Sequence, residues 1–115
     1  MTTYRDNLIG LVADIASIER QLNYEKNVPI ANVPAELFCQ WFDDLYHPDT
    51  DLFKETFSEE ERDHLARFHQ YFEERADKIS EVADVTELQK FSEWQEISNY
   101  ASEILIHCGW QDVAT

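Results

Sequence analysis

Glycine, proline and cysteine are scarce in this sequence. Two glycines and three prolines in 115 residues are too few turn residues for an all-β fold. The two cysteines, Cys39 and Cys108, both lie in apolar segments with helical periodicity. We expect free, buried thiols, although the sequence leaves a disulfide bridge between them open.

Basic residues are also scarce. Nine Lys and Arg face 24 Asp and Glu, which gives a net charge of −15. Residues 43–63 carry nine acids and two bases, and residues 80–115 carry seven acids and one base. Such a charge repels nucleic-acid phosphates and anionic membranes and attracts basic protein surfaces, so we expect neither nucleic acid nor membrane as a partner. The alternative is that these acids only keep the protein in solution.

Long apolar runs are absent. No stretch approaches the roughly 20 apolar residues that a membrane-spanning helix needs. The N-terminus has no basic start followed by an apolar run and a small-residue cleavage site, as a signal peptide would. We therefore expect a cytoplasmic protein in a reducing environment.

Apolar residues are nevertheless plentiful. They make up 43% of the sequence and include fifteen aromatic residues, which excludes disorder. A chain of this length is expected to form one domain with one core. The sequence predicts an all-α fold, a single-domain bundle of four to five helices that spans residues 1–115.

The first predicted helix covers residues 3–25. Its apolar residues recur at spacings of three and four, as on one face of a helix; they include Tyr4, Leu8, Leu11, Ile15, Ile18 and Leu22. Thr2 or Thr3 is the expected N-cap. Gly10 suggests that another helix approaches closely.

The second predicted helix starts near Pro34, which fits a first helical turn, and ends before Pro48. Residues 47–57 are predicted to be a loop with one short helical turn that brings Leu52, Phe53 and Phe57 onto the core.

Capping patterns predict three further helices. Ser58 and Glu61 match a capping box at the start of a helix that continues to about residue 79. The same pattern at Thr86 and Ser92 predicts a short helix over 86–91 and a longer one to about 108. Gly109 is a natural left-handed cap after the last helix.

Chemical motifs are weak. Glu61 and His64 form one Glu-x-x-His pair, whereas di-iron bundles use this motif twice. Asp49 and Asp51 resemble the start of a calcium loop, but Phe53 replaces a ligand residue and a lysine replaces the glycine of the turn. Glycine-rich phosphate loops and nucleophile elbows are absent. We expect no enzyme, no cofactor and no metal; the alternative is a carboxylate-bridged metal bundle that uses Glu61, His64 and acids from other helices.

The acidic surface is the strongest functional signal. A partner with a basic surface would be steered by the acids and anchored by aromatic rings. The candidate partner-binding residues are Asp43, Asp44, Tyr46, Asp49, Asp51, Glu59, Glu60 and Asp63. The alternative for Tyr46, and more so for Phe53 and Phe57, is that these rings belong to the core.

Three stretches resemble known proteins. The segments "VPAELFCQWFDDLYHP", "FSEEERDHLARFHQYFEER" and "SEWQEI" are similar to pieces of the small acidic immunity proteins of bacterial contact-dependent growth inhibition and polymorphic-toxin systems. The resemblance implies a cytoplasmic protein that binds and neutralises the C-terminal domain of one cognate toxin. Many such toxins are nucleases with basic clefts, which an acidic inhibitor can occupy. The candidate residues above come from the charge argument alone.

Other binding functions stay open at this point. The protein could instead be a regulatory or adaptor subunit that binds a helical partner. The sequence determines neither the identity and activity of the partner, nor which acidic face is used, nor the oligomeric state.

Overall fold

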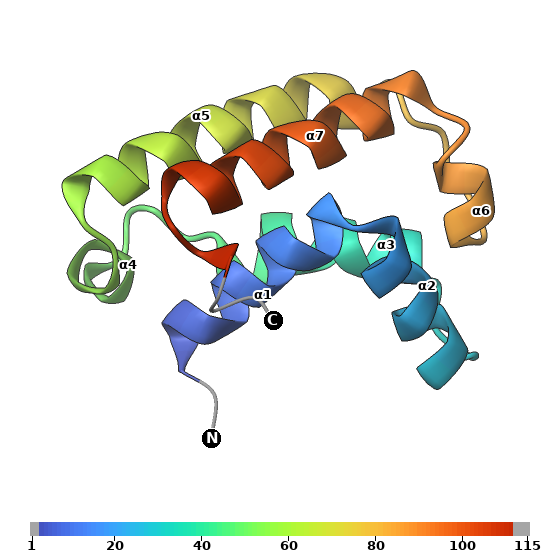
Figure 1. Cartoon of the computed structure of the whole chain (residues 1–115), viewed down its shortest axis with the longest axis horizontal. Coiled ribbons are helices and arrows are strands. Elements are labelled where there is room, and N and C mark those ends of the chain that lie inside the picture. Colours follow the sequence, from blue (N-terminus) through green and yellow to red (C-terminus); the bar gives the residue numbers. More distant parts are fainter. Residues whose placement is uncertain (1–2, 112–115) are drawn as a thin grey trace.

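All regular secondary structure is helical in the computed structural model, which describes residues 3–111 (Figure 1). The elements are α1 (Tyr4–Ala16), α2 (Ile18–Asn27), α3 (Val33–Cys39), η1 (Gln40–Leu45), α4 (Asp51–Thr56), α5 (Glu59–Ala76), α6 (Val85–Leu88) and α7 (Ser92–His107). The predicted all-α fold is confirmed. The predicted count of four to five helices is wrong, because this part of the chain forms seven α-helices and one π-helix.

The two longest helices, α5 and α7, lie side by side along the length of the molecule (Figure 1). Helix α1 packs beneath α7 and contacts α2, α3 and η1 as well. The short helices α4 and α6 lie at opposite ends of the α5–α7 pair (Figure 1). Within residues 3–111, no helix has the length and apolar character needed to span a membrane.

One hydrophobic cluster joins these helices. Trp41 of η1, Phe68 and Phe72 of α5, and Trp94 of α7 have no exposed surface. Phe53 is also buried, so that α4 contributes to the same cluster. The buried apolar residues of α5 and α7 recur at helical spacing and therefore face inward.

The predicted single helix over residues 3–25 is wrong, because the chain leaves the helical conformation at Ser17. Ser17 is extended, with φ −127° and ψ 115°, and its hydroxyl accepts a hydrogen bond from the Arg20 amide as the N-cap of α2. Figure 1 shows that α2 runs in a different direction from α1 after this break. Ile18 and Leu22, predicted to be in the core, are therefore 50% and 42% exposed.

Side chains from distant segments stabilise this break. The carbonyl groups of Asp14 and Ile15 accept hydrogen bonds from the Gln21 amide at 2.8 and 3.0 Å. Ser98 of α7 also donates to the Ile15 carbonyl, and Gln89 donates to the Gln21 side chain, each at 2.8 Å. Gln21 is fully buried, and these bonds supply the partners that its polar atoms need there.

The second predicted helix exists as α3 followed by the π-helix η1. Asn32 caps α3 and Pro34 lies in its first turn. At the end of η1 the Tyr46 amide donates to the Trp41 carbonyl at 3.3 Å, and the chain leaves the helix before Pro48, as predicted. Trp41 thereby faces the core.

The start of α5 and the cap after α7 are confirmed. Ser58 and Glu61 form the reciprocal capping box. Gly109 has φ +68°, the left-handed conformation that follows many helices. Gly10 was predicted to mark a close helix approach; this is wrong, because no heavy atom lies within 4 Å of the position that a Cβ would take there.

Other helix ends differ from the predictions. Thr3 caps α1, which lies within the predicted choice of Thr2 or Thr3; Thr2 lies outside the described residues. Helix α5 ends at Ala76 instead of about residue 79. Asp84, not Thr86, caps α6, and α7 begins at Ser92 without a side-chain cap.

Burial also differs from expectation at two positions. Cys39 is exposed and Cys108 is half-buried, and both thiols are free, so the expected burial of Cys39 is wrong. Leu52, expected to face the core, is 57% exposed. Phe53 and Phe57 are each 2% exposed, which confirms the alternative that they are core residues.

Candidate protein-binding surface

Eight carboxylates between residues 43 and 63 are exposed. They are Asp43, Asp44, Asp49, Asp51, Glu55, Glu59, Glu60 and Asp63. None of them pairs with any cationic group in the described part of the chain. The two bases of this segment, Lys54 and Arg62, also make no ion pair with residues 3–111. Most of the surplus negative charge of this segment therefore faces solvent unneutralised.

Helix N-termini position several of these acids. Asp51 is the first residue of α4, and Glu59 and Glu60 are the first two residues of α5. Carboxylates are stabilised there, because the free amide groups and the helix dipole favour negative charge. This local effect explains where these acids lie, and it leaves their charges exposed to a partner.

A surface hollow beside α5 brings part of the candidate set together. The residues that line it are Tyr46, Pro48, Phe53, Glu59, Arg62, Asp63 and Ala66. We call it the Tyr46 hollow. Burial of the ring, and secondarily the charge of Asp49, raise the pKa of the Tyr46 hydroxyl.

Two other candidate acids belong to different hollows. Asp44 lines a hollow between α1 and η1 together with Asp6 and Asp14. Glu60 lines a hollow between α5 and the end of α7. The eight candidate residues therefore do not form one patch. The largest group that lies together consists of Tyr46, Asp49, Glu59 and Asp63.

Tyr46 itself lies in the core and not on the surface. It is 7% exposed, and its ring stacks on Trp41 at 4.7 Å and on His69 at 4.8 Å between centroids. Phe53 contacts it edge-on at 5.5 Å. Tyr46 therefore lies at the base of the hollow and does not protrude as an anchor for a partner.

Glu61 has a structural role that separates it from its neighbours. Its carboxylate accepts hydrogen bonds from Arg5 at 2.7 and 3.1 Å and from the Trp110 indole at 3.0 Å. These bonds, the Arg5 bonds above all, lower the pKa of Glu61 from its ordinary value of 4.5 to about 2. The carboxylate is therefore not free to bind a metal in the way that the Glu61–His64 alternative requires.

The remaining chemistry near Glu61 is limited. The rings of His64 and His107 stack at 5.8 Å with an interplanar angle of 4°. Within residues 3–111, His, Cys, Asp and Glu side chains nowhere form a group of three that could bind a metal ion. Burial, and secondarily the charges of Glu61 and Glu60, raise the pKa of Cys108 to about 11, so its thiol is almost entirely protonated at neutral pH and is a poor nucleophile.

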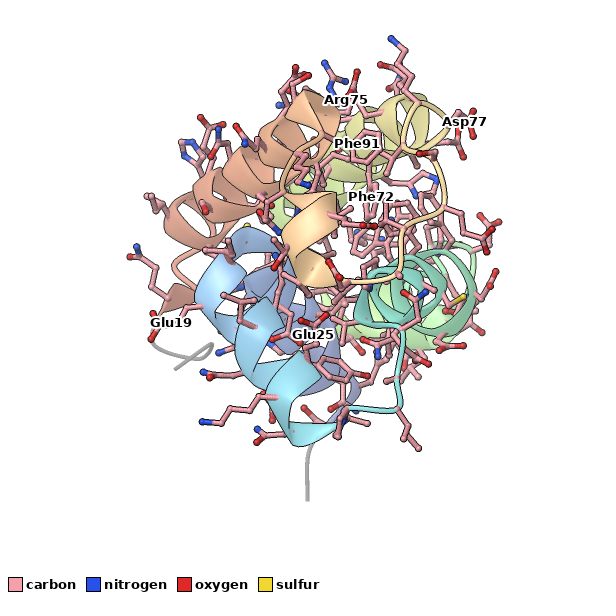
Figure 2. The ribbon with its side chains drawn as sticks, turned by 90° about the vertical axis from the view of Figure 1, so that its right-hand side faces the viewer. Glu19, Glu25, Phe72, Arg75, Asp77 and Phe91 are labelled. Carbon is pink, nitrogen blue, oxygen red and sulfur yellow. The ribbon has the colours of Figure 1, made fainter. Side chains whose placement is uncertain are left out.

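The opposite end of the molecule, shown in Figure 2, uses its acids differently. Glu25 accepts a hydrogen bond from the Val85 amide at 2.9 Å and so fixes the start of α6. Arg75 pairs with Glu96 at 2.7 Å and lies over the Tyr71 ring at 3.4 Å. Several carboxylates there have internal partners, whereas the eight exposed acids of residues 43–63 have no ion-pair partner among residues 3–111.

Sequence reasoning missed two acids of the α1–η1 hollow, Asp6 and Asp14. Their spacing of eight places them on one side of a helix, a signal that the sequence contains. The sequence does not show that η1 brings Asp44 beside them, because that depends on the packing of η1 against α1.

Comparison with models of protein families, with curated proteins and with solved structures finds no match for this chain.

Proposed function

We propose that this protein binds a basic protein partner through the acidic surface around the Tyr46 hollow, formed by Asp49, Glu59 and Asp63. The observation that carries the proposal is that these carboxylates are exposed and make no ion pair within the described residues. A partner that presents Lys and Arg side chains would supply the missing cations.

The physical advantage of such a partner is twofold. Unpaired like charges repel each other and destabilise the folded state, and a cationic surface removes that repulsion. The same field increases the rate of encounter with a basic protein well above that of a neutral pair. The hollow then offers a concave surface with Tyr46 and Phe53 at its base.

The class of partner that we propose is a toxin domain, with this protein as its immunity protein. Support comes from the acidic surface together with the similarity of the three sequence segments to such proteins. A nuclease toxin binds phosphates in a basic cleft, so an acidic inhibitor would occupy the surface that its substrate needs.

The experiment needs the toxin domain encoded beside the gene of this protein, provided that the neighbouring gene encodes a large secreted protein with a variable C-terminal domain. Association is measured by stopped-flow fluorescence between low and high salt. We expect the rate to fall about tenfold or more as salt rises, because steering by surface charge is screened. Co-expression should also restore growth of cells that produce the toxin domain.

Charge-reversal variants locate the surface. Asp49→Lys with Asp63→Lys should slow association, whereas the control pair Glu19→Lys with Glu103→Lys, which changes the net charge equally at two exposed positions of α2 and α7, should slow it less. An equal effect of both pairs would show that only net charge matters and would refute the placement. Association that ignores salt would favour an adaptor held by apolar contacts instead.

A further inference from the structure

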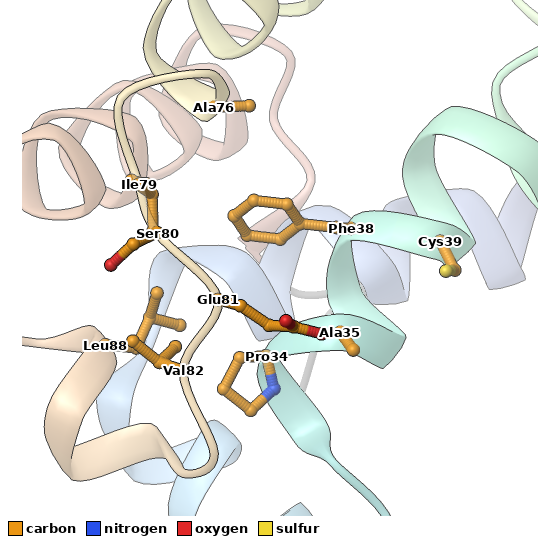
Figure 3. Close-up of a pocket in the computed structure, with 10 residues that line it drawn as sticks. All are labelled: Pro34, Ala35, Phe38, Cys39, Ala76, Ile79, Ser80, Glu81, Val82 and Leu88. Carbon is orange, nitrogen blue, oxygen red and sulfur yellow. The ribbon is translucent and has the colours of Figure 1, made fainter.

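An apolar pocket lies between α3, the loop that follows α5, and α6. Its volume is about 290 Å³, and its walls are mainly the apolar side chains of Pro34, Phe38, Ile79, Val82 and Leu88 (Figure 3). Sites for drug-sized ligands typically range from about 300 to 1,000 Å³. The pocket is therefore suited to one or two amino-acid side chains.

Hydrogen bonds fix the loop that forms one wall of the pocket. Asn32 accepts a bond from the Ala35 amide as the cap of α3, and its own amide donates to the Val82 carbonyl, both at 3.1 Å. Glu25 fixes the next turn of the chain through the Val85 amide. Because these bonds join groups of the chain itself, an incoming side chain would not have to order this wall.

Aromatic packing supports the opposite wall. The Phe38 ring lies parallel to Trp94, with an interplanar angle of 21° and 5.7 Å between centroids, and contacts Phe72 edge-on at 5.3 Å. Trp94 and Phe72 are fully buried. Phe38 is thus held by the core while it lines the pocket.

One acidic residue, Glu81, lines the pocket. Figure 3 shows the Glu81 side chain extending from the loop toward Ala35 of α3. The two segments that form the pocket, residues 34–39 and 76–88, carry five acids and one base, Lys78. An apolar group with an anionic end, such as a fatty acid, would be repelled. A second copy of this chain would bring the same surplus of negative charge.

We infer that this pocket binds an aliphatic or aromatic side chain of a protein partner, presented by a segment in which Lys or Arg residues flank that side chain. The apolar walls would bury the side chain, Glu81 would pair with a flanking cation, and the surplus of acids in residues 34–39 and 76–88 would favour the positive charge of the segment. The proposed function is needed only for the origin of this segment, which would be a second contact of the same basic partner.

Short peptides test the pocket without the partner. Acetyl-Lys-Lys-Phe-Lys-Lys-amide supplies the proposed chemistry, the same peptide with a central Ala lacks the anchor, and a peptide with Glu in place of each Lys reverses the charge. Amide chemical shifts of the isotope-labelled protein give the affinity and the location. We expect the Phe peptide to shift amides of residues 35–39 and 76–83 and to bind about tenfold or more tightly than the Ala peptide, because a Phe side chain becomes buried.

A filled pocket is the next test. Ala35 is exposed and lines the opening, so Ala35→Phe should occupy the pocket while every core side chain stays in place. Its matched control is Ala66→Phe, an exposed alanine that lines the Tyr46 hollow. The first variant should abolish the advantage of the Phe peptide over the Ala peptide, and the second should leave it unchanged. Alkylation of the exposed Cys39, which also lines the pocket, should slow when the Phe peptide is bound.

The outcomes separate this inference from the proposed function. Equal affinities for the Phe and Ala peptides, or shifts confined to the Tyr46 hollow, would overturn the pocket and leave the acidic-surface proposal to its own charge-reversal test. Strong binding of the Glu peptide would overturn the proposed ligand chemistry. If Asp49→Lys with Asp63→Lys did not slow association with the toxin domain, the proposed function would be overturned, whereas the peptide result would remain valid.

Discussion

Arg5 and Glu61, 56 positions apart in the sequence, form a two-pronged ion pair between the first turns of α1 and α5. Arg5 Nη2 lies 2.7 Å from Glu61 Oε2, and Arg5 Nη1 lies 3.1 Å from Glu61 Oε1. The same carboxylate accepts from Trp110 and from the Ser58 amide. One side chain therefore connects α1, the start of α5 and the segment after α7.

The first prediction concerns the loss of this carboxylate. Glu61→Ala should lower the free energy of unfolding by about 2–3 kcal/mol, because it removes a charged hydrogen-bond acceptor with three partners from a site where the Glu61 side chain is 17% exposed. Urea denaturation followed by circular dichroism measures it. Glu60→Ala, which removes an exposed neighbour, should change stability by less than about 0.5 kcal/mol. Equal effects would contradict the role assigned to Glu61.

The pH dependence of stability follows from the same carboxylate. The folded-state pKa of Glu61 is about 2, below its ordinary value of 4.5. A lowered pKa means that the contribution of Glu61 to stability is complete above pH 4.5 and is lost as the pH falls toward 2. The difference in stability between the wild type and Glu61→Gln should therefore shrink over this interval and stay constant from pH 5 to 7. A difference that grows on acidification would refute this assignment.

Salt should stabilise the protein. The unpaired carboxylates of residues 43–63 repel one another, and added sodium chloride screens that repulsion. Urea denaturation in low and high salt should show a rising midpoint. The triple variant Asp49→Asn, Glu59→Gln, Asp63→Asn should show a weaker dependence on salt. A midpoint that falls with salt would mean that internal ion pairs dominate over repulsion.

Replacing each of the two glycines by alanine should change the stability of the protein in opposite directions. Gly10 is inside α1 with open space around it, so Gly10→Ala should stabilise the protein by about 0.5–1 kcal/mol. Gly109 has φ +68°, so Gly109→Ala should destabilise it by about 1 kcal/mol. Thermal denaturation of both variants tests the pair. The same sign for both would show that the conformation assigned to one of them is wrong.

His69 should be needed for its hydrogen bond and not only for its shape. Its Nδ1 accepts from the Trp41 indole at 3.1 Å, and Trp41 is fully buried. His69→Phe keeps an aromatic ring but leaves the indole N–H without its acceptor, which should cost about 1–3 kcal/mol. Denaturation should show this loss together with a change in tryptophan emission. The control His47→Phe, at an exposed position, should be nearly neutral.

The long helices could be predicted because their signals are local. The capping box of Ser58 and Glu61, which predicted the start of α5, involves residues only three positions apart. The same applies to Gly109. Helix starts and ends that depend on neighbouring residues could therefore be predicted from the sequence.

The break after α1 could not be predicted, because its stabilising partners are distant in sequence. Ser98 and Gln89 satisfy polar groups beside Ser17, and neither can be recognised as a partner before the fold is known. For the same reason, the charge pattern predicted an acidic surface but not its division among three hollows. The packing of η1 against α1 places Asp44 apart from Asp63.

The buried Gln21 has one further consequence, for the fidelity of folding. Its amide satisfies two carbonyl groups of α1, and its oxygen accepts from Gln89. If α2 slid along its neighbours by one turn, this amide would lose all three bonds in an apolar interior, at a cost of several kcal/mol. A single polar side chain thus makes misaligned packing of α2 unfavourable, whereas apolar contacts alone would allow it.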